Sequence, residues 1–258
     1  MVKGETIVSF KDVCMYFDGI RAIDHMSFDV EEGMIFGIIG PNGSGKSTLF
    51  NVLTGVYTPT SGKIFYRDML INNMSPHSIT GRGISRTFQN IKLFESETVL
   101  DNLKVAHAAH IQYGVIDALL MTKKYRQQEK QIEEESMEIL KYLGLQKYAD
   151  QRAGALPYGK QRRVEIARAL CCRPEVLLLD EPAAGMNPNE IDDLNELIVN
   201  IRDHYRLTVM VVEHQMRLVM SICDEILVVN FGEKMMQGLP DKVKKDPRVL
   251  EAYLGKAS

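Results

Sequence analysis

The chain has 258 residues, of which 45% are hydrophobic and 25% are charged, and both fractions are ordinary for a globular protein. A chain of this length can bury one sizeable core, so we expect one domain with subdomains rather than two independent domains. The net charge of −3 argues against a general attraction to nucleic acid.

The N-terminal segment and the cysteines bear on the cellular compartment. The first ten residues hold no apolar core of signal-peptide length, and no apolar run reaches the roughly 20 residues that a membrane-spanning helix needs. The four cysteines, of which Cys171 and Cys172 are adjacent, show no metal-ligand spacing and suit a reducing compartment. We therefore expect a cytoplasmic protein that reaches a membrane only through a partner.

The first third of the chain is typical of strands that lead into a glycine-rich turn. Residues 6–13 and 22–30 are rich in β-forming side chains. Residues 34–39 are almost wholly apolar, as in a strand that is covered on both faces. A helix is expected at about 46–53, and a hairpin-like stretch at 62–71.

The pattern changes to helix from about residue 98 to residue 156. Residues 99–109 fit one helix, and residues 128–143 fit another, with an apolar stripe among many charges. The charged run at 123–135 indicates the solvated face of these helices, and a docking surface for a partner is the alternative.

The last part of the chain alternates strand and helix. A helix is expected at 159–172, and it is followed by strands at 176–179 and 208–212 with a helix at 189–204 between them. This alternation predicts a parallel sheet.

The strongest motif runs from Gly40 to Thr48 and matches the P-loop pattern G-x-x-x-x-G-K-[ST]. Its glycines allow backbone angles that point N–H groups at phosphate oxygens, Lys46 adds a positive charge, and Ser47 offers a hydroxyl to Mg²⁺. The helix that follows directs the positive end of its dipole at the phosphates. A glycine-rich turn with an accidental lysine is the weaker alternative, because a strand precedes the motif and a helix follows it. The predicted nucleotide-binding residues are Gly40, Pro41, Asn42, Gly43, Ser44, Gly45, Lys46, Ser47 and Thr48.

Polar side chains follow two further strands. Asp180 and Glu181 end an apolar run, where two acids are costly unless they have partners or a role. Beside a P-loop, Asp180 can hold Mg²⁺ and Glu181 can orient and polarise an attacking water, whereas the alternative is that the pair caps the next helix. His214 directly follows the strand at 208–212 and is either an ordinary packed or surface residue or a contact to the γ-phosphate. Open α/β sheets bind ligands at the carboxyl ends of their strands, so we favour the phosphate contact.

These motifs, together with LPYGKQRRVEIARAL at 156–170, resemble the ATP-binding subunits of ABC transporters over essentially the whole chain. The stretch resembles the ABC signature LSGGQ, whose helix N-terminus contacts the γ-phosphate of ATP held by the opposite subunit. Pro157 replaces the usual serine, Tyr158 a glycine and Lys160 a glutamine, whereas Gly159 is kept as a nucleotide contact. The alternative is an ordinary helix start with a proline in its first turn.

The resemblance implies an α/β fold with a P-loop NTPase (RecA-like) core, an N-terminal antiparallel β subdomain and an inserted α-helical subdomain. It implies a single ABC ATPase domain over 1–258. The core is expected at about 1–95 and 160–239, the helical subdomain at about 96–159, and a C-terminal tail at about 240–258.

The resemblance also gives roles to residues outside the main motifs. Gln89 matches the Q-loop glutamine, which touches Mg²⁺ or the attacking water beside the groove for the membrane partner. Phe17 matches the aromatic residue that stacks on adenine, with Tyr16 as a substitute and a core position for Phe17 as the alternative. Asn187 stands where the family usually has aspartate.

The segments DEPAAGMNP, VVEHQM and VLEAYLG look like those of branched-chain amino acid importer ATPases of the LivG type, which usually have aspartate at the position of Gln215. The resemblance implies ATP and Mg²⁺ as cofactors, a second ABC ATPase subunit (identical or different), two transmembrane permease subunits and, indirectly, a solute-binding protein. It implies no nucleic acid, and a place on the inner face of the cell membrane. The alternatives are an ATPase for urea or amide import, one for lipopolysaccharide export, and a non-transport ABC ATPase.

Overall fold

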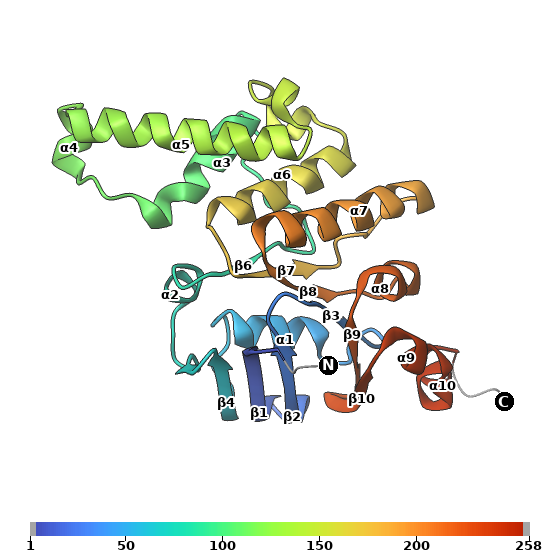
Figure 1. Ribbon diagram of the computed structural model, residues 1–258. Coiled ribbons are helices and arrows are strands. Elements are labelled where there is room, and N and C mark those ends of the chain that lie inside the picture. The colour runs from blue at the N-terminus through green and yellow to red at the C-terminus, as the bar shows by residue number, and fades with distance from the viewer. Residues whose placement is uncertain (1–3, 255–258) are drawn as a thin grey trace. The chain divides into compact units, whose positions relative to one another are not determined.

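The computed structural model describes residues 4–254, which form two compact units (Figure 1). The core unit comprises the described residues up to Ile79 and those from Glu175 onward, and the helical unit comprises Thr80–Pro174. Residues 255–258 of the expected C-terminal tail lie outside the described residues.

The core unit begins with an antiparallel sheet in the order β2-β1-β4-β5, which confirms the expected N-terminal β subdomain. Its strands are β1 (Thr6–Phe17), β2 (Ile20–Glu31), β4 (Ser61–Tyr66) and β5 (Met69–Leu70). Asp18 and Gly19 both have positive φ and form the tight turn between β1 and β2. The two strands reach this turn, so β1 extends four residues beyond the expected end at 13.

A second sheet in the core unit has the order β10-β9-β3-β8-β7. Its strands are β3 (Ile35–Ile39), β7 (Val176–Asp180), β8 (Thr208–Val212), β9 (Glu225–Asn230) and β10 (Glu233–Gly238). Every residue of β3, β7 and β8 is buried, as their continuous apolar sequences predict.

The expectation of a parallel sheet is correct for β9, β3, β8 and β7 and wrong for β10, which is antiparallel to β9. Phe231 and Gly232 both have positive φ, so they form a two-residue turn that returns the chain directly along β9.

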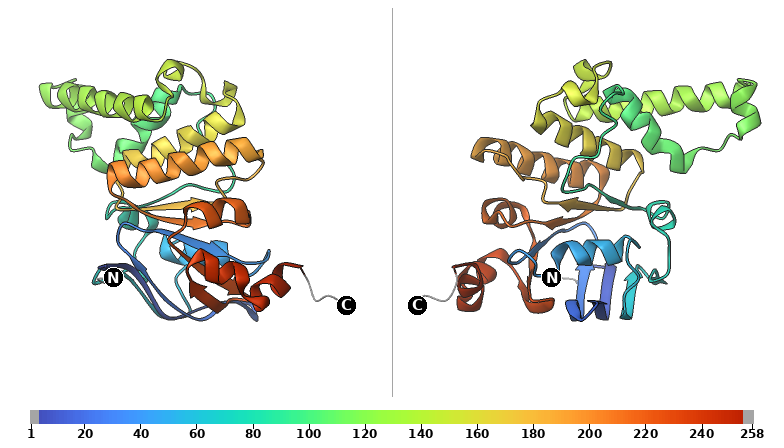
Figure 2. Two further views of the ribbon diagram at one scale, coloured as in Figure 1. Left: turned by 45° about the vertical axis from the view of Figure 1, so that its right-hand side comes forward. Right: turned by 180° about the vertical axis from the view of Figure 1, so that it is seen from behind.

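The core unit also contains the helices α1 (Lys46–Leu53), α2 (Pro76–Thr80, which ends one residue into the helical unit), α7 (Pro188–Tyr205), α8 (Met216–Ile222), α9 (Pro240–Lys245) and α10 (Pro247–Leu254). Helix α1 has the expected bounds, and α7 is one residue longer at each end than expected. The side chain of Asn195 on α7 donates a 2.7 Å hydrogen bond to Ser221 on α8. Figure 2 shows these helices from two further sides.

The helical unit contains the short strand β6 (Ile84–Arg86), the helices α3 (Val99–Ala106), α4 (Val115–Leu119), α5 (Lys123–Tyr142) and α6 (Tyr158–Cys171), and the 3₁₀ turns η1 (His107–His110), η2 (Gln146–Tyr148) and η3 (Ala153–Ala155). The expected helix at 99–109 changes to a 3₁₀ turn after Ala106. The expected helix at 128–143 begins five residues earlier, where Thr122 caps it.

Helix α5 lies alongside α3 and α6, with α4 at its N-terminal end (Figures 1 and 2). Its predicted apolar stripe is confirmed, because Ile132, Ile139 and Leu140 are buried and Leu143 is buried at the C-cap. Among residues 4–254, no helix has both the length and the apolar character needed to cross a membrane.

Candidate nucleotide-binding site

Three loops meet at one edge of the core sheet, where the neighbouring strands β3, β8 and β7 end. The P-loop follows β3, Glu213 and His214 follow β8, and Asp180 is the last residue of β7. The strand ends are level, because Val212 pairs with both Ile38 and Asp180. The convergence of polar groups that the sequence predicts is therefore confirmed.

The P-loop is packed so tightly against its surroundings that glycine is required. A Cβ at Gly40 would collide with the carbonyl oxygen of Val229, and one at Gly45 would collide with that of Ala22. Gly43 has open space around it but a φ of 77°, a conformation that L side chains rarely adopt. These positions therefore need glycine for the backbone conformation and the close packing of the loop, and such a loop can direct its N–H groups at phosphate oxygens.

Lys46 is buried over the P-loop, where its Nζ donates hydrogen bonds of 2.8 Å to the carbonyl oxygens of Gly40 and Pro41. Burial lowers the pKa of Lys46, and the carboxylates of Glu181 and Asp180 act in the opposite direction. The lysine is thus held beside two acids at the place where the motif needs a cation.

Two hydroxyls of the motif have different surroundings. Ser47 lies exposed in the first turn of α1. The Oγ atom of Ser44 is buried and makes no hydrogen bond within residues 4–254. Buried hydroxyls usually have a partner, so Ser44 is an orphaned donor inside the phosphate cradle. A hard donor set of the Ser47 hydroxyl and the Asp180 carboxylate suits Mg²⁺.

Asp180 is buried, and Glu181 follows it in an unusual backbone conformation. Glu181 has a φ of 45°, and its N–H donates a 2.9 Å hydrogen bond to the carbonyl oxygen of Val212. A non-glycine residue in this region is uncommon, and here the neighbouring strand holds it there. The Oε2 atom of Glu181 lies 3.8 Å from the Nδ1 atom of His214.

The alternative that Asp180 and Glu181 cap the next helix is wrong. Helix α7 begins at Pro188, and its cap is Asn187, whose Oδ1 accepts hydrogen bonds of 3.0 and 3.1 Å from the N–H groups of Asn189 and Glu190. Glu190 Oε2 accepts a 2.9 Å bond from Asn187 N–H and completes a capping box. Asn187 is therefore the N-cap of α7, and asparagine caps a helix as well as the usual aspartate does.

Glu213 is a residue of this site that the sequence reasoning passed over. Its side chain is fully buried and accepts backbone hydrogen bonds from Ala183 (2.9 Å), His214 (3.0 Å) and Gln215 (3.2 Å). Burial raises its pKa, and these three N–H groups oppose the rise. A glutamate directly after the apolar pair Val211-Val212 was the available signal.

Gln215 closes a second link between the same two loops. Its Nε2 donates a 2.9 Å hydrogen bond to the carbonyl oxygen of Ala183. Glu213 and Gln215 together tie the segment after Glu181 to the segment that carries His214. Gln215 departs from the LivG-type pattern, and this hydrogen bond gives it a role in positioning the two loops.

Tyr16 and Phe17 end β1 at the turn into β2. The Tyr16 hydroxyl donates a 2.6 Å hydrogen bond to Asp24, which raises the pKa of Tyr16 and lowers that of Asp24. The ring of Phe17 packs edge-on against Tyr57 with a centroid distance of 5.1 Å. Phe17 is partly buried and Tyr16 is exposed, and adenine stacking by Phe17, with Tyr16 as the substitute, stays a prediction.

A hydrogen-bond network fixes the same hairpin. Cys14, Asp24 and His25 offer ligand atoms within 4.8 Å of one another. The carboxylate of Asp24 already accepts bonds from Tyr16 and Arg21, and His25 Nδ1 lies 2.7 Å from Asp12. These mutual bonds account for the cluster without a metal ion.

Gln89 belongs to the helical unit, where a buried ion pair holds its backbone. Arg162 is fully buried and donates to the carbonyl oxygens of Phe88 (2.7 Å) and Gln89 (2.9 Å) and to Glu165 (2.6 Å). Glu165 in turn accepts a 3.1 Å bond from Phe88 N–H, and burial raises its pKa against the effect of Arg162. Sequence reasoning assigned Arg162 only to a basic helix start, and its internal role was not predicted.

Gly159 is the second residue of α6, and Pro157 is the N-cap. The cap makes no side-chain hydrogen bond. The proline supplies neither a hydroxyl nor an N–H to the helix start. The first turn therefore relies on its backbone N–H groups for any contact with an anion.

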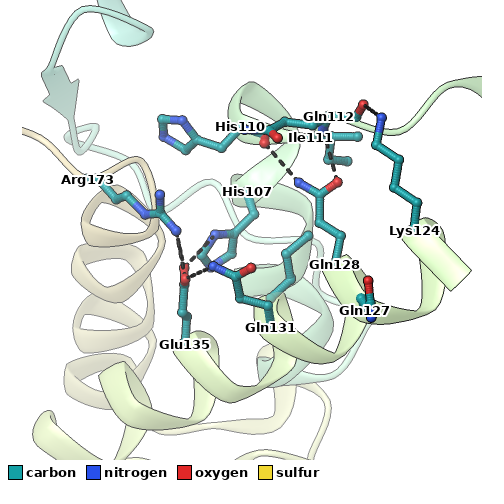
Figure 3. A pocket seen from close by; sticks show the side chains of 11 residues that line it. His107, His110, Ile111, Gln112, Lys124, Gln127, Gln128, Gln131, Glu135 and Arg173 are labelled. Carbon is teal, nitrogen blue, oxygen red and sulfur yellow. Dashed lines mark hydrogen bonds and ion pairs between the residues drawn. The ribbon is translucent and has the colours of Figure 1, made fainter.

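The helical unit also contains a polar pocket of about 470 Å³ between η1 and α5 (Figure 3). Glu135 accepts bonds of 2.6 and 2.7 Å from Arg173 and one of 2.8 Å from Gln131. His107 is buried with its Nδ1 3.8 Å from Glu135, and Lys124 donates to the Gln112 carbonyl oxygen at 2.6 Å. The charged groups of this pocket thus bond one another or the backbone, and the pocket has no evident ligand chemistry.

Comparison with known proteins decides the family. The sequence profile described as "ABC transporter" matches residues 23–184, which is more than half of the chain. The chain belongs to the ABC transporter family. The profile described as "Branched-chain amino acid ATP-binding cassette transporter" matches residues 233–258. This ABC protein is thus an ATP-binding subunit with ATPase chemistry, as the P-loop edge predicts.

Individual relatives cover nearly the whole ABC protein. It is 42% identical over 251 residues to the high-affinity branched-chain amino acid transport ATP-binding protein BraF of Pseudomonas aeruginosa, with 97% of this chain and 98% of that protein covered. It is 40% identical over 253 residues to LivG of Escherichia coli K12, which carries the same description, with 98% and 99% covered.

Solved structures agree with the sequence relatives. The ADP conformation of an ATP-binding cassette of an ABC transporter matches with a TM-score of 0.85 at 32% identity, covering 97% of this chain and 99% of that chain. A nucleotide-free cassette matches with a TM-score of 0.84 at 31% identity, covering 97% and 100%. The expected ABC ATPase fold is confirmed.

Proposed function

We propose that this ABC protein is the ATP-hydrolysing subunit of an importer for branched-chain amino acids. The single observation that carries the ATPase part is the shared sheet edge, where the P-loop, the Asp180–Glu181 pair and His214 lie together. The names of the relatives BraF and LivG and the match of residues 233–258 support the choice of solute.

The proposed catalytic roles follow from the positions at this edge. ATP binds over residues 40–48, with Lys46 turning from its loop carbonyls to the β and γ phosphates. Glu181 polarises the attacking water, and His214, 3.8 Å from Glu181, contacts the γ-phosphate. Phe17 or Tyr16 stacks on adenine.

Mg²⁺ is the proposed metal cofactor, held by Ser47, Asp180 and Gln89. Bound there, it would neutralise charge on the phosphates. Gly159 is proposed to contact ATP of the opposite subunit through the backbone of α6. Pro157 and Tyr158 depart from the signature, so a mixed dimer with two unequal ATP sites is part of the proposal.

The proposed partners are a second ABC ATPase subunit and two transmembrane permease subunits, which in turn receive the solute from a binding protein. The subunit would then be cytoplasmic and peripheral on the inner face of the cell membrane. The relatives' names as transport ATP-binding proteins support this arrangement.

Replacement of Glu181 with glutamine tests the proposal. The variant should bind ATP with wild-type affinity and lose nearly all turnover, because the amide keeps the shape of the side chain but is no base. Radiolabelled ATP binding and phosphate release measure the two properties. Glu196→Gln on the exposed face of α7 is the control and should hydrolyse ATP normally. Substantial hydrolysis by Glu181→Gln would remove the base assignment.

A second test concerns assembly. The isolated subunit should hydrolyse ATP slowly compared with the complex of two ATPase subunits and permeases, because a site that excludes water needs two chains. Equal rates in both preparations would contradict the proposed dimeric site. The solute is tested by the ATP hydrolysis rate of the complex. A rate that rises with a branched-chain amino acid and its binding protein, but not with urea or an amide, would support the proposed solute.

A further inference from the structure

The segment around α4 exposes a continuous group of large aliphatic side chains. We call this group the apolar tip; it consists of Val115, Ile116, Leu119, Leu120 and Met121, which are 86%, 73%, 80%, 69% and 59% exposed. None of the residues of α4 is buried. Single exposed apolar residues are common on proteins, but a cluster of this kind usually marks an interaction surface.

The fold does not need these apolar side chains. Asp117 organises the segment instead, since its carboxylate accepts bonds from the N–H of Gly114 (3.1 Å) and the hydroxyl of Thr122 (3.0 Å). The one acid of the segment is thereby turned toward its own backbone and away from a surface role. The aliphatic side chains remain available for contact outside this chain.

Basic residues follow the apolar tip directly. Lys123, Lys124 and Arg126 are exposed, and they lie in the first turns of α5. Lys124 donates to the carbonyl oxygen of Gln112 (2.6 Å) and Arg126 Nε to that of Met121 (3.0 Å), neutral acceptors that leave both positive charges uncompensated. Cations are unfavourable at a helix N-terminus because of the helix dipole, and the first turn of α5 has no acidic residue to offset them. In a chain of net charge −3, this is a local basic cluster against the overall charge.

The composition of the apolar tip favours lipid over protein as its occupant. The energetic centres of protein interfaces are rich in Trp, Tyr and Arg, whereas Leu and Val are under-represented there. The apolar tip has only aliphatic side chains and one methionine. Aliphatic side chains beside lysine and arginine are the pattern of segments that lie in the boundary between headgroups and acyl chains.

We propose that the apolar tip inserts into the surface of a membrane that contains anionic lipids, with Lys123, Lys124 and Arg126 against the headgroup phosphates. This contact goes beyond the proposed function, in which the permeases alone hold the subunit at the membrane. It does not depend on ATP or on the identity of the solute.

Vesicle cosedimentation of the full chain without nucleotide tests the proposal. The wild-type chain should bind phosphatidylglycerol–phosphatidylcholine vesicles and bind pure phosphatidylcholine vesicles less. Added salt should weaken its binding to the anionic vesicles. The double variant Ile116→Glu/Leu119→Glu should bind anionic vesicles at least about tenfold less, because it places charge in the acyl boundary. Lys123→Ser/Lys124→Ser should bind less and lose most of its salt dependence.

The control is Phe231→Glu, which adds one negative charge, against two in the double variant, at an apolar residue that is 84% exposed but lies in the core unit. It should bind vesicles as the wild type does, and circular dichroism should show all variants folded. Absence of wild-type binding, or equal binding by Ile116→Glu/Leu119→Glu, would overturn the proposal. If that double variant bound vesicles normally but failed to assemble with the permeases, the apolar tip would be a protein interface instead. ATP hydrolysis is measured separately, so failure here leaves the proposed function intact.

Discussion

Replacing Glu213 with alanine should weaken both the fold and the ATPase site. Glu213 accepts three backbone hydrogen bonds at 2.9, 3.0 and 3.2 Å while fully buried. The donors are the N–H groups of Ala183, His214 and Gln215, so the substitution leaves three donors in a buried place without their acceptor. The loops that carry Glu181 and His214 then lose their main connection.

The size of the effect follows from these bonds. A net contribution of about 1 kcal/mol for each hydrogen bond gives a loss of about 3 kcal/mol in the free energy of unfolding. Burying the carboxylate costs free energy, as its raised pKa indicates, and the alanine variant avoids that cost. We therefore expect a net loss of about 2 to 3 kcal/mol in the free energy of unfolding. Glu213→Gln should lose about half as much, because its one carbonyl oxygen can still accept two of the bonds.

Urea denaturation and ATP hydrolysis measure the two consequences. Hydrolysis should fall more than ATP binding, because the P-loop itself keeps its contacts while His214 and Glu181 lose their relative position. The control is Glu196→Ala, an exposed glutamate on α7, which should change stability by less than about 0.5 kcal/mol. A similarly small change for Glu213→Ala, with normal hydrolysis, would refute the reasoning.

The remaining predictions concern one residue each. Lys46→Ala should lose nucleotide binding, measured by fluorescent ATP titration, because the cation over the P-loop is gone. Arg162→Met should lower the free energy of unfolding by about 3 to 5 kcal/mol in urea denaturation, because it leaves Glu165 buried without its partner. Burial lowers the pKa of His107, so the unfolded chain binds its proton more readily and stability should fall as pH drops below about 6.5. His107→Gln should flatten this pH dependence.

Each of these predictions has a contrary result, and those for Arg162 and His107 also have a control variant. Unchanged ATP affinity of Lys46→Ala would overturn the phosphate-clamp interpretation. Arg162→Met/Glu165→Met should recover part of the lost stability, and no recovery would contradict the ion-pair account. The exposed residue His77 is the control for His107, and His77→Gln should keep the wild-type slope of stability against pH. An unchanged slope in His107→Gln would show that other groups cause it.

Much of the ATP site was predictable because its parts are contiguous in the sequence. The P-loop is one segment of nine residues with a strand before it and a helix after it. The buried strands β3, β7 and β8 are largely apolar runs; β3 leads into the P-loop, β7 ends in Asp180, and Glu213 follows β8. Such features depend on local propensity and on the two-sided cover of parallel strands, both of which leave a pattern in the sequence.

Element ends were less predictable than element types. Helix α5 begins at Lys123 because Thr122 caps it, although the apolar periodicity starts later. Strand β10 turns back antiparallel because of two residues with positive φ at Phe231 and Gly232. The subdomain limits expected at about 96 and 159 stay a prediction.

The sequence by itself determined the fold class and the nucleotide loop, because both arise from short-range patterns. The tertiary structure alone decided that Glu213 ties two loops, that Arg162 is an internal ion-pair partner, and that the apolar tip is exposed. In the sequence, a buried glutamate cannot be told from a solvated one, and the same holds for an arginine or for a group of aliphatic residues. Only the packing of distant segments determines which of them meets water.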